Sequence, residues 1–243
     1  MKKRTAALCL LLVCAALFAS CGGAIELSYE NGAYRNEKSG AAYVMAPLCY
    51  RAISRLDAEE IAKIVGTKSE KVLYAIEGLD SSLWLTDENF DLYHSETVTL
   101  PALWEMAVTR ISLCLSGAYA VPVATIERSE QIADVVETYQ KGTTIPGNQI
   151  IPQPETRYEL LFVASDYPGI AYVLEYWKFA EEVDVYAKLN ADGSIPDLYP
   201  GIKSEITEQG EAVFHLGKNL MYDRVNDCFY AVGDVLESYF FTE

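Results

Sequence analysis

The chain has 243 residues, with 19 basic and 35 acidic side chains and a formal net charge of −16 at pH 7. Hydrophobic residues make up 51% of it and charged residues 22%, which is the composition of a folded globular protein and excludes intrinsic disorder. The acidic balance excludes nucleic acid as a partner, because nucleic-acid binding depends on neutralising phosphates with Lys and Arg.

The N-terminus has the three parts of a secretory signal. Residues 2–4 (Lys-Lys-Arg) are a positive start, residues 5–19 are an apolar run, and the small residue Ser20 precedes Cys21. The run is shorter than the roughly 20 residues that a membrane-spanning helix needs. Residues 17–21 (Leu-Phe-Ala-Ser-Cys) resemble the lipobox of bacterial lipoproteins. The resemblance implies cleavage after Ser20, lipid on Cys21 and an extracytoplasmic chain anchored to a bacterial membrane; an ordinary signal peptide is the alternative.

After this signal peptide (residues 1–20), residues 21–24 are the lipidated cysteine and a short tether. Alternating hydrophobicity and turn residues then predict many short strands. In chain order they span residues 25–30, 33–36, 42–46, 48–54, 71–77, 91–94, 97–100, 111–115, 158–164, 170–179, 183–189, 211–216, 220–224 and 228–232.

Helices are predicted in two places. Asp57 and Glu60 have the spacing of a capping box at the start of residues 57–66. Residues 129–139 are the stronger candidate, because their apolar side chains fall on one helical face. Residues 234–239 fit either a terminal helix or a strand.

Together these elements predict an α+β fold, a mostly antiparallel, strand-rich body with two or three short helices. The proline-containing residues 142–157 are predicted to be a loop. Residues 25–243 then form a single domain, or two lobes, 25–141 and 158–243, joined by that loop.

Three cysteines lie in the predicted folded part. Cys114 stands in an apolar run and is predicted to be a buried hydrophobic residue. A bridge between Cys49 and Cys228 is compatible with a location outside the cytoplasm. The chain has no C-x-x-C pair, so neither a zinc ribbon nor a redox dithiol is expected.

No sequence motif for nucleophilic catalysis or nucleotide binding occurs in the chain. His94 shares a strand face with Glu96, and His215 is flanked by apolar residues; both are interpreted as structural rather than as zinc ligands. A loose calcium site at Asp192 and Asp197 is the alternative to a plain turn.

Two acidic clusters and one aromatic strand complete the candidates. The clusters are Asp87, Glu88 and Asp91, and Glu181, Glu182 and Asp184. They are interpreted as solvated faces, the alternative being a carboxylate pair of a glycoside hydrolase. The aromatic residues of segment 172–179 are either core or an exposed platform for sugar or protein.

The sequence therefore predicts an envelope-anchored lipoprotein that is a non-enzymatic binding or interaction module, with no cofactor or metal. Its expected partners are the membrane, through lipid on Cys21, and a protein or surface ligand. The alternative is an anchored hydrolase acting on glycan or peptide through dispersed carboxylates. A third possibility is an assembly role through an exposed sheet edge or residues 142–157.

Overall fold

The computed structural model describes residues 24–66, 70–115, 122–150 and 152–241. Of these, 50% lie in strands and 12% in helices, and only one described helix has seven residues or more. The predicted α+β class with two or three helices is therefore wrong, and the protein is β-rich. Ser20 and Cys21 lie outside the described residues.

The chain divides into two compact units. Unit 1 holds the described residues up to Met45 together with Ser54–Val98, and unit 2 holds Ala46–Ile53 and the chain from Thr99 onward. The chain thus crosses between units at residues 45–46, 53–54 and 98–99. Residues 142–157, which the sequence analysis treats as a loop, lie within unit 2.

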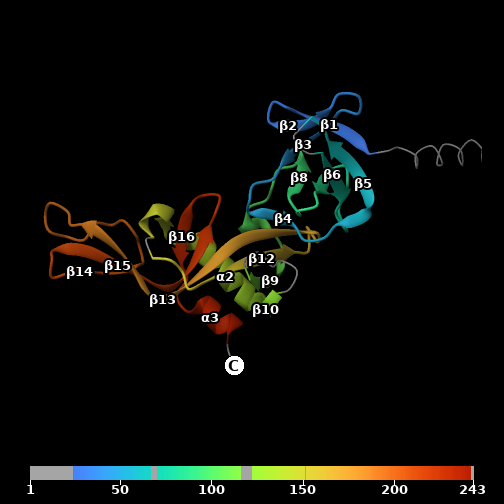
Figure 1. Ribbon diagram of the computed structural model, residues 1–243. Coiled ribbons are helices and arrows are strands. Elements are labelled where there is room, and N and C mark those ends of the chain that lie inside the picture. The colour runs from blue at the N-terminus through green and yellow to red at the C-terminus, as the bar shows by residue number, and fades with distance from the viewer. Residues whose placement is uncertain (1–23, 67–69, 116–121, 151, 242–243) are drawn as a thin grey trace, which may run out of the picture. The chain divides into compact units, whose positions relative to one another are not determined.

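Unit 1 is a closed barrel of strands in the order β1-β2-β3-β8-β7-β6-β5 (Figure 1). A parallel pairing between β1 and β5 closes it, with Leu27 opposite Ile64. Its interior is a cluster of buried residues that includes Leu73, Leu85 and Tyr93. The strands are β1 Ile25–Glu30, β2 Ala33–Asn36, β3 Ala41–Met45, β5 Leu56–Ile64, β6 Lys71–Ala75, β7 Trp84–Thr86 and β8 Leu92–Ser95.

The predicted helix over residues 57–66 is wrong, because this segment is most of β5. Ala62 and Ile64 are fully buried while Lys63 between them is half-buried, which is the alternation of a strand. Residues 62–64 of β5 pair with β1 on one side and with β6 on the other. These long-range contacts outweigh the local capping signal.

Unit 2 is built on one large, mostly antiparallel sheet in the order β10-β9-β12-β13-β15-β16-β11 (Figure 1). Strand β14 also pairs with β15, and β4 pairs with β13. The strands are β4 Tyr50–Ala52, β9 Val108–Leu115, β10 Pro122–Ile126, β11 Thr144–Pro146, β12 Thr156–Ala164, β13 Ile170–Lys188, β14 Lys203–Ile206, β15 Glu211–Asp223 and β16 Cys228–Ala231.

Helices cover one face of this sheet. The helix predicted at 129–139 is confirmed as α2 (Ser129–Lys141), which buries Ile132, Val135 and Tyr139 in a core shared with the sheet. Its N-cap is Arg128, so Ser129 is the first helical residue. The terminal segment is the helix α3 (Val235–Phe240), and two short 3-10 turns, Leu103–Glu105 and Gly147–Gln149, complete the helical elements described.

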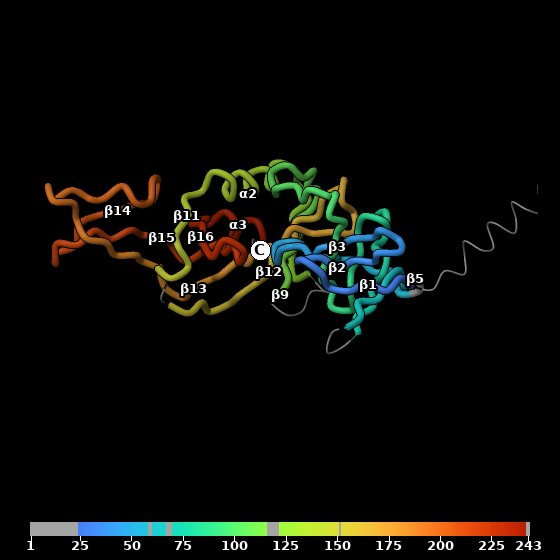
Figure 2. Tube along the Cα trace, turned by 90° about the horizontal axis from the view of Figure 1, so that it is seen from above, coloured from blue at the N-terminus to red at the C-terminus, as the bar shows by residue number. Residues whose placement is uncertain are grey.

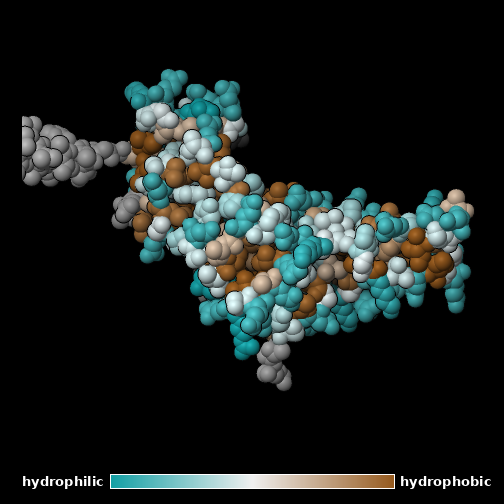
Figure 3. All heavy atoms as spheres, turned by 180° about the vertical axis from the view of Figure 1, so that it is seen from behind, coloured by the Kyte–Doolittle hydropathy of each residue, from teal (hydrophilic) through white to brown (hydrophobic). Residues whose placement is uncertain are grey.

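Two strands of unit 2 are longer than predicted. The predicted strands 170–179 and 183–189 are a single β13, and 211–216 and 220–224 are a single β15. Their distal halves, residues 183–188 and 211–216, form with β14 a three-stranded segment that we call the arm (Figure 2). The arm extends beyond α2 and α3, and hydrophobic residues, among them Leu198 and Ile206, are exposed at this end of unit 2 (Figure 3).

Candidate functional site

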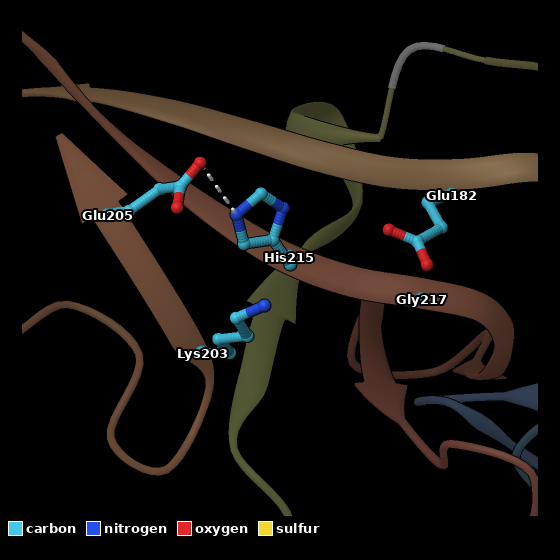
Figure 4. A pocket seen from close by; sticks show the side chains of 5 residues that line it. All are labelled: Glu182, Lys203, Glu205, His215 and Gly217. Atoms are coloured by element: carbon cyan, nitrogen blue, oxygen red, sulfur yellow. Dashed lines mark ion pairs between the residues drawn. The ribbon is translucent and has the colours of Figure 1, made fainter. Parts of the chain in front are cut away.

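A polar pocket of about 330 Å³ opens on the arm. It is lined by Glu182, Lys203, Glu205, His215 and Gly217, and we call it the His215 pocket. Figure 4 shows the imidazole ring between Glu205 and Lys203 on one side and Glu182 on the other. Strands β13, β14 and β15 each contribute to the lining, so pairing across the arm positions the site.

Irregular pairing between β13 and β15 shapes the base of the pocket. Residues 178 and 183 of β13 pair with residues 219 and 217 of β15, so residues 179–182 form a bulge. Phe179 and Val183 anchor the bulge in a buried cluster, and Lys218 donates a hydrogen bond to the carbonyl of Ala180 at 3.0 Å. The bulge leaves Glu182 exposed at the rim of the pocket.

His215 is held by a carboxylate from the neighbouring strand. Asp184 lies opposite His215 in the register, and its Oδ1 is 2.9 Å from Nδ1. Because a carboxylate only accepts, the ring donates the Nδ1 proton and Nε2 is left toward the pocket. The nearest carboxylate oxygen to Nε2 belongs to Glu205 at 3.7 Å, beyond hydrogen-bond distance.

The Asp184–His215 pair fixes a ring orientation, as such pairs do in metal and catalytic sites. The two carboxylates lie at opposite ring nitrogens, so one ion cannot contact both of them and the ring. No group of three or more His, Cys, Asp or Glu that could hold a metal ion occurs among the described residues. The arrangement can bind and orient a ligand through hydrogen bonds.

A second feature is a pair of buried acids on the central strands. Glu159 of β12 and Glu175 of β13 are direct cross-strand partners, 2% and 7% exposed. Glu175 accepts a hydrogen bond from Arg224 Nε at 2.9 Å and one from Trp177 Nε1 at 2.6 Å. On its other neighbouring strand, β9, Glu159 lies opposite Cys114. Burial is the main reason why the pKa of the Cys114 thiol is raised, and the nearby Glu159 carboxylate adds to the effect.

A third feature is a buried tyrosine cluster next to α2. Tyr139 donates to Asp223 Oδ2 at 2.8 Å, and its hydroxyl is 3.0 Å from that of Tyr172. The ring of Tyr230 lies 4.8 Å from that of Tyr139. Burial is the main reason why the pKa of each of these three tyrosines is raised. Because these side chains are buried and contact one another, we interpret the cluster as structural.

In unit 1, the first predicted acidic cluster has a structural role. Asp87 is fully buried, and its Oδ2 is 2.8 Å from Nζ of Lys71. Asp91 is 3.7 Å from the same ammonium group. The hydrogen bond from Lys71 to Asp87 is the main reason why the pKa of Lys71 is raised. The interpretation of these acids as a simple solvated face is wrong for Asp87.

The two histidines have different neighbours from those that the sequence predicts. His94 is buried, with Nδ1 3.0 Å from the carbonyl of Ser95, whereas Glu96 pairs with Arg35. The structure therefore does not bring His94 and Glu96 together. His215, by contrast, meets Asp184, a residue of the second acidic cluster.

The remaining candidates are structural. Cys49, Cys114 and Cys228 are free and buried, so the Cys49–Cys228 bridge that the sequence left open is not formed in the described structure. Burial raises the pKa of Cys49 to about 11. Asp192 accepts hydrogen bonds from the backbone amide and the hydroxyl of Ser194. These bonds are those of a plain turn. In segment 172–179, Tyr172, Tyr176 and Phe179 are buried and Trp177 is half-buried.

Sequence reasoning missed two parts of this picture. Lys203 and Glu205 carry no motif, and only strand pairing brings them beside His215. The pair Glu159 and Glu175 is also invisible in the sequence, since it depends on the register of β12 against β13. The signal available in the sequence is that Glu159 and Glu175 each stand within a largely apolar segment.

Comparison of the chain with protein-family models, with curated proteins and with solved structures gave no match. Within the described ranges, no helix has the length and hydrophobicity required to span a membrane.

Proposed function

We propose that this protein is a lipid-anchored component of a bacterial envelope that binds a surface ligand or partner without catalysing a reaction, and that the His215 pocket is its contact site. The signal-like leader and the lipobox-like residues before Cys21 support the anchor. The observation that carries the binding role is the imidazole of His215, which Asp184 holds at 2.9 Å while Nε2 is left for a ligand.

The anchor is tested by metabolic labelling with a radioactive fatty acid. We expect the full chain to incorporate label and Cys21→Ala to lose it, because thioether attachment needs the Cys21 thiol. Cys14→Ala is the matched control, since this cysteine lies within the leader and is expected to leave labelling unchanged. Equal labelling of wild type and Cys21→Ala would refute the anchor.

Binding is tested by thermal melts of the full chain, purified in a detergent without a sugar headgroup. The panel holds Ca²⁺, Zn²⁺, cell-wall fragments, oligosaccharides and peptides. A ligand at one hundred times its Kd stabilises the native state by about 2.7 kcal/mol. We expect one ligand class to raise the melting temperature of wild type and Tyr29→Ala, an exposed control in unit 1, but not that of His215→Ala. A panel without any shift would refute binding at this pocket.

The alternative, an anchored hydrolase acting on glycan or peptide, is favoured by one observation, the cross-strand pair Glu159 and Glu175. Cβ atoms of such partners lie about 4.5–5.5 Å apart, and retaining glycosidases hold their carboxyl groups at about 5–5.5 Å. Both acids are buried, however, and Glu175 is engaged by Arg224 and Trp177. This burial favours a structural role over access to a polymer.

The two functions are separated by one assay. If the chain is a hydrolase, it releases soluble products from cell-wall fragments and Glu175→Gln abolishes the release. We expect no release from wild type. An assembly role would instead appear as cross-links to a partner at β10 or β11, the two ends of the large sheet.

A further inference from the structure

The His215 pocket belongs to one face of the arm, on which strand register sets the order of the side chains. Asp184, His215 and Lys203 occupy one cross-strand row, on β13, β15 and β14. Tyr186, Val213 and Glu205 occupy the next row in the same order. Residues two apart on a strand point to the same side, so Tyr186 lies on the face that carries the pocket.

From this face we infer that the ligand of the His215 pocket is a saccharide and that the ring of Tyr186 is the surface on which a sugar ring stacks. The inference rests on the proposed function, because it names the ligand of the same site.

The charge of the lining disfavours anionic ligands. The carboxylates of Glu182, Asp184 and Glu205 repel a phosphate or a carboxylate ligand. The ammonium group of Lys203 lies opposite His215 in the register but is outnumbered by these carboxylates, so charge favours a cationic or a neutral ligand over an anion. The described residues offer no group of three metal ligands, and titration with oligolysine separates an amine from a neutral ligand.

The lining offers the donors and acceptors that hydroxyl groups need. Each hydroxyl donates one hydrogen bond and accepts up to two. The carboxylates of Glu182 and Glu205 accept, Lys203 donates, and Nε2 of His215 is the ring nitrogen that Asp184 does not engage; Figure 4 shows Glu205 and Lys203 on one side of the ring and Glu182 on the other. Neighbouring hydroxyls of one sugar ring can therefore all be satisfied at once.

Tyr186 supplies the apolar contact. Tyr186 follows Asp184 by two residues on β13 and is 57% exposed. A sugar ring has one face lined by C–H groups, which packs on the apolar body of an aromatic ring while the sugar hydroxyls reach polar groups beside it. The pocket volume of about 330 Å³ lies in the range of small-ligand sites, about 300–1,000 Å³.

The test is an NMR titration of the full chain in a detergent without a sugar headgroup. The probes are neutral hexose oligomers, N-acetylhexosamine oligomers, an oligolysine peptide and inorganic phosphate. We expect only a saccharide to shift the resonances of Tyr186, Lys203 and His215. Tyr186→Ala is expected to weaken its binding about fivefold to tenfold, while Tyr186→Phe keeps the ring and stays within about twofold.

The exposed Tyr29→Ala in unit 1 is the matched control and should leave saccharide affinity unchanged. If oligolysine or phosphate binds at the His215 pocket and saccharides do not, the ligand class is refuted while the binding role survives. Saccharide binding that Tyr186→Ala leaves intact also refutes the inference. If no probe shifts these resonances and the thermal panel is flat, the inference and the proposed function fail together.

Discussion

The carboxylate of Asp223 accepts four hydrogen bonds in the core of unit 2. It is fully buried and accepts hydrogen bonds from Tyr139, from the side chain of Asn226 and from the backbone amides of Val225 and Asn226. These bonds tie α2 to the turn between β15 and β16. Removing the acceptor takes this partner from the buried hydroxyl of Tyr139 and breaks three further hydrogen bonds that hold the turn, which costs more than a typical hydrogen bond contributes.

We expect Asp223→Ala to lower the free energy of unfolding by about 2–4 kcal/mol, measured by urea denaturation. Asp192→Ala is the control. Asp192 also accepts hydrogen bonds in a turn, but it is exposed, so water replaces its partners and the loss should be much smaller. Equal losses for the two variants would show that Asp223 is not a structural centre.

Residue types were easier to predict than residue pairs. His215 and Asp184 both stand out in the sequence, yet they are 31 positions apart and only the register of β13 and β15 joins them. Tyr139 and Asp223 are 84 positions apart. A single sequence does not specify which of 35 acids meets which partner, because long-range strand register sets the pairing.

At the scale of elements, Gly217 permits the irregularity beside the His215 pocket. Its φ of +82° lies in the left-handed region, in the middle of β15 and opposite Val183 at the bulge. Nothing lies within 4 Å of the position that a Cβ would take. The glycine is therefore required by backbone conformation and not by space.

Gly217→Ala is expected to lower the free energy of unfolding by about 1–2 kcal/mol, because an L-residue resists this conformation. It should also shift the NMR resonances of Glu182 and His215, which flank it in the pocket. Lys188→Ala, at the exposed distal end of β13, is the control and should leave the resonances of His215 in place. A Gly217→Ala protein as stable as wild type would mean that the strand accommodates a different turn at no cost.

Elements with strong local signals were predicted well. Helix α2 is amphipathic over thirteen residues, so its local pattern and its packing agree. Segment 57–66 has a capping signal but only about two turns, which is marginal for an isolated helix, and its pairing with β1 and β6 decides the outcome. Residues 180–182 lie between the predicted strands 170–179 and 183–189, whereas in the structure they belong to a bulge within the single strand β13.

At the scale of the whole molecule, both units bury tyrosines whose pKa is raised. In unit 2 these include Tyr139, Tyr172 and Tyr230, and in unit 1 Tyr93; burial is the first cause for each. In unit 1, Lys71 also has a raised pKa through its hydrogen bond to Asp87. All these groups keep their protons more tightly in the folded state than in the unfolded state.

The expected consequence is loss of stability at alkaline pH. Below about pH 10 these tyrosines are protonated in both states and contribute no pH dependence. Above about pH 10 the unfolded chain releases protons that the folded chain retains, so unfolding becomes more favourable as pH rises. Urea midpoints should be level near neutral pH and fall above about pH 10.

Tyrosinate absorbance provides the control for this prediction. The buried tyrosines should titrate only together with loss of the tertiary circular dichroism signal. A smooth titration of all 17 tyrosines while the fold persists would contradict the burial described above.

The closure of the barrel by β1 and β5 has a mechanical consequence. β1 is the first described strand, and its first three residues pair with β5 while its last three pair with β2. A pull along the axis of β1 from its N-terminal end loads these hydrogen bonds in shear, all at the same time, rather than opening them one by one. A chain tethered at its N-terminus would thus transmit tension into a part of the fold that resists it collectively.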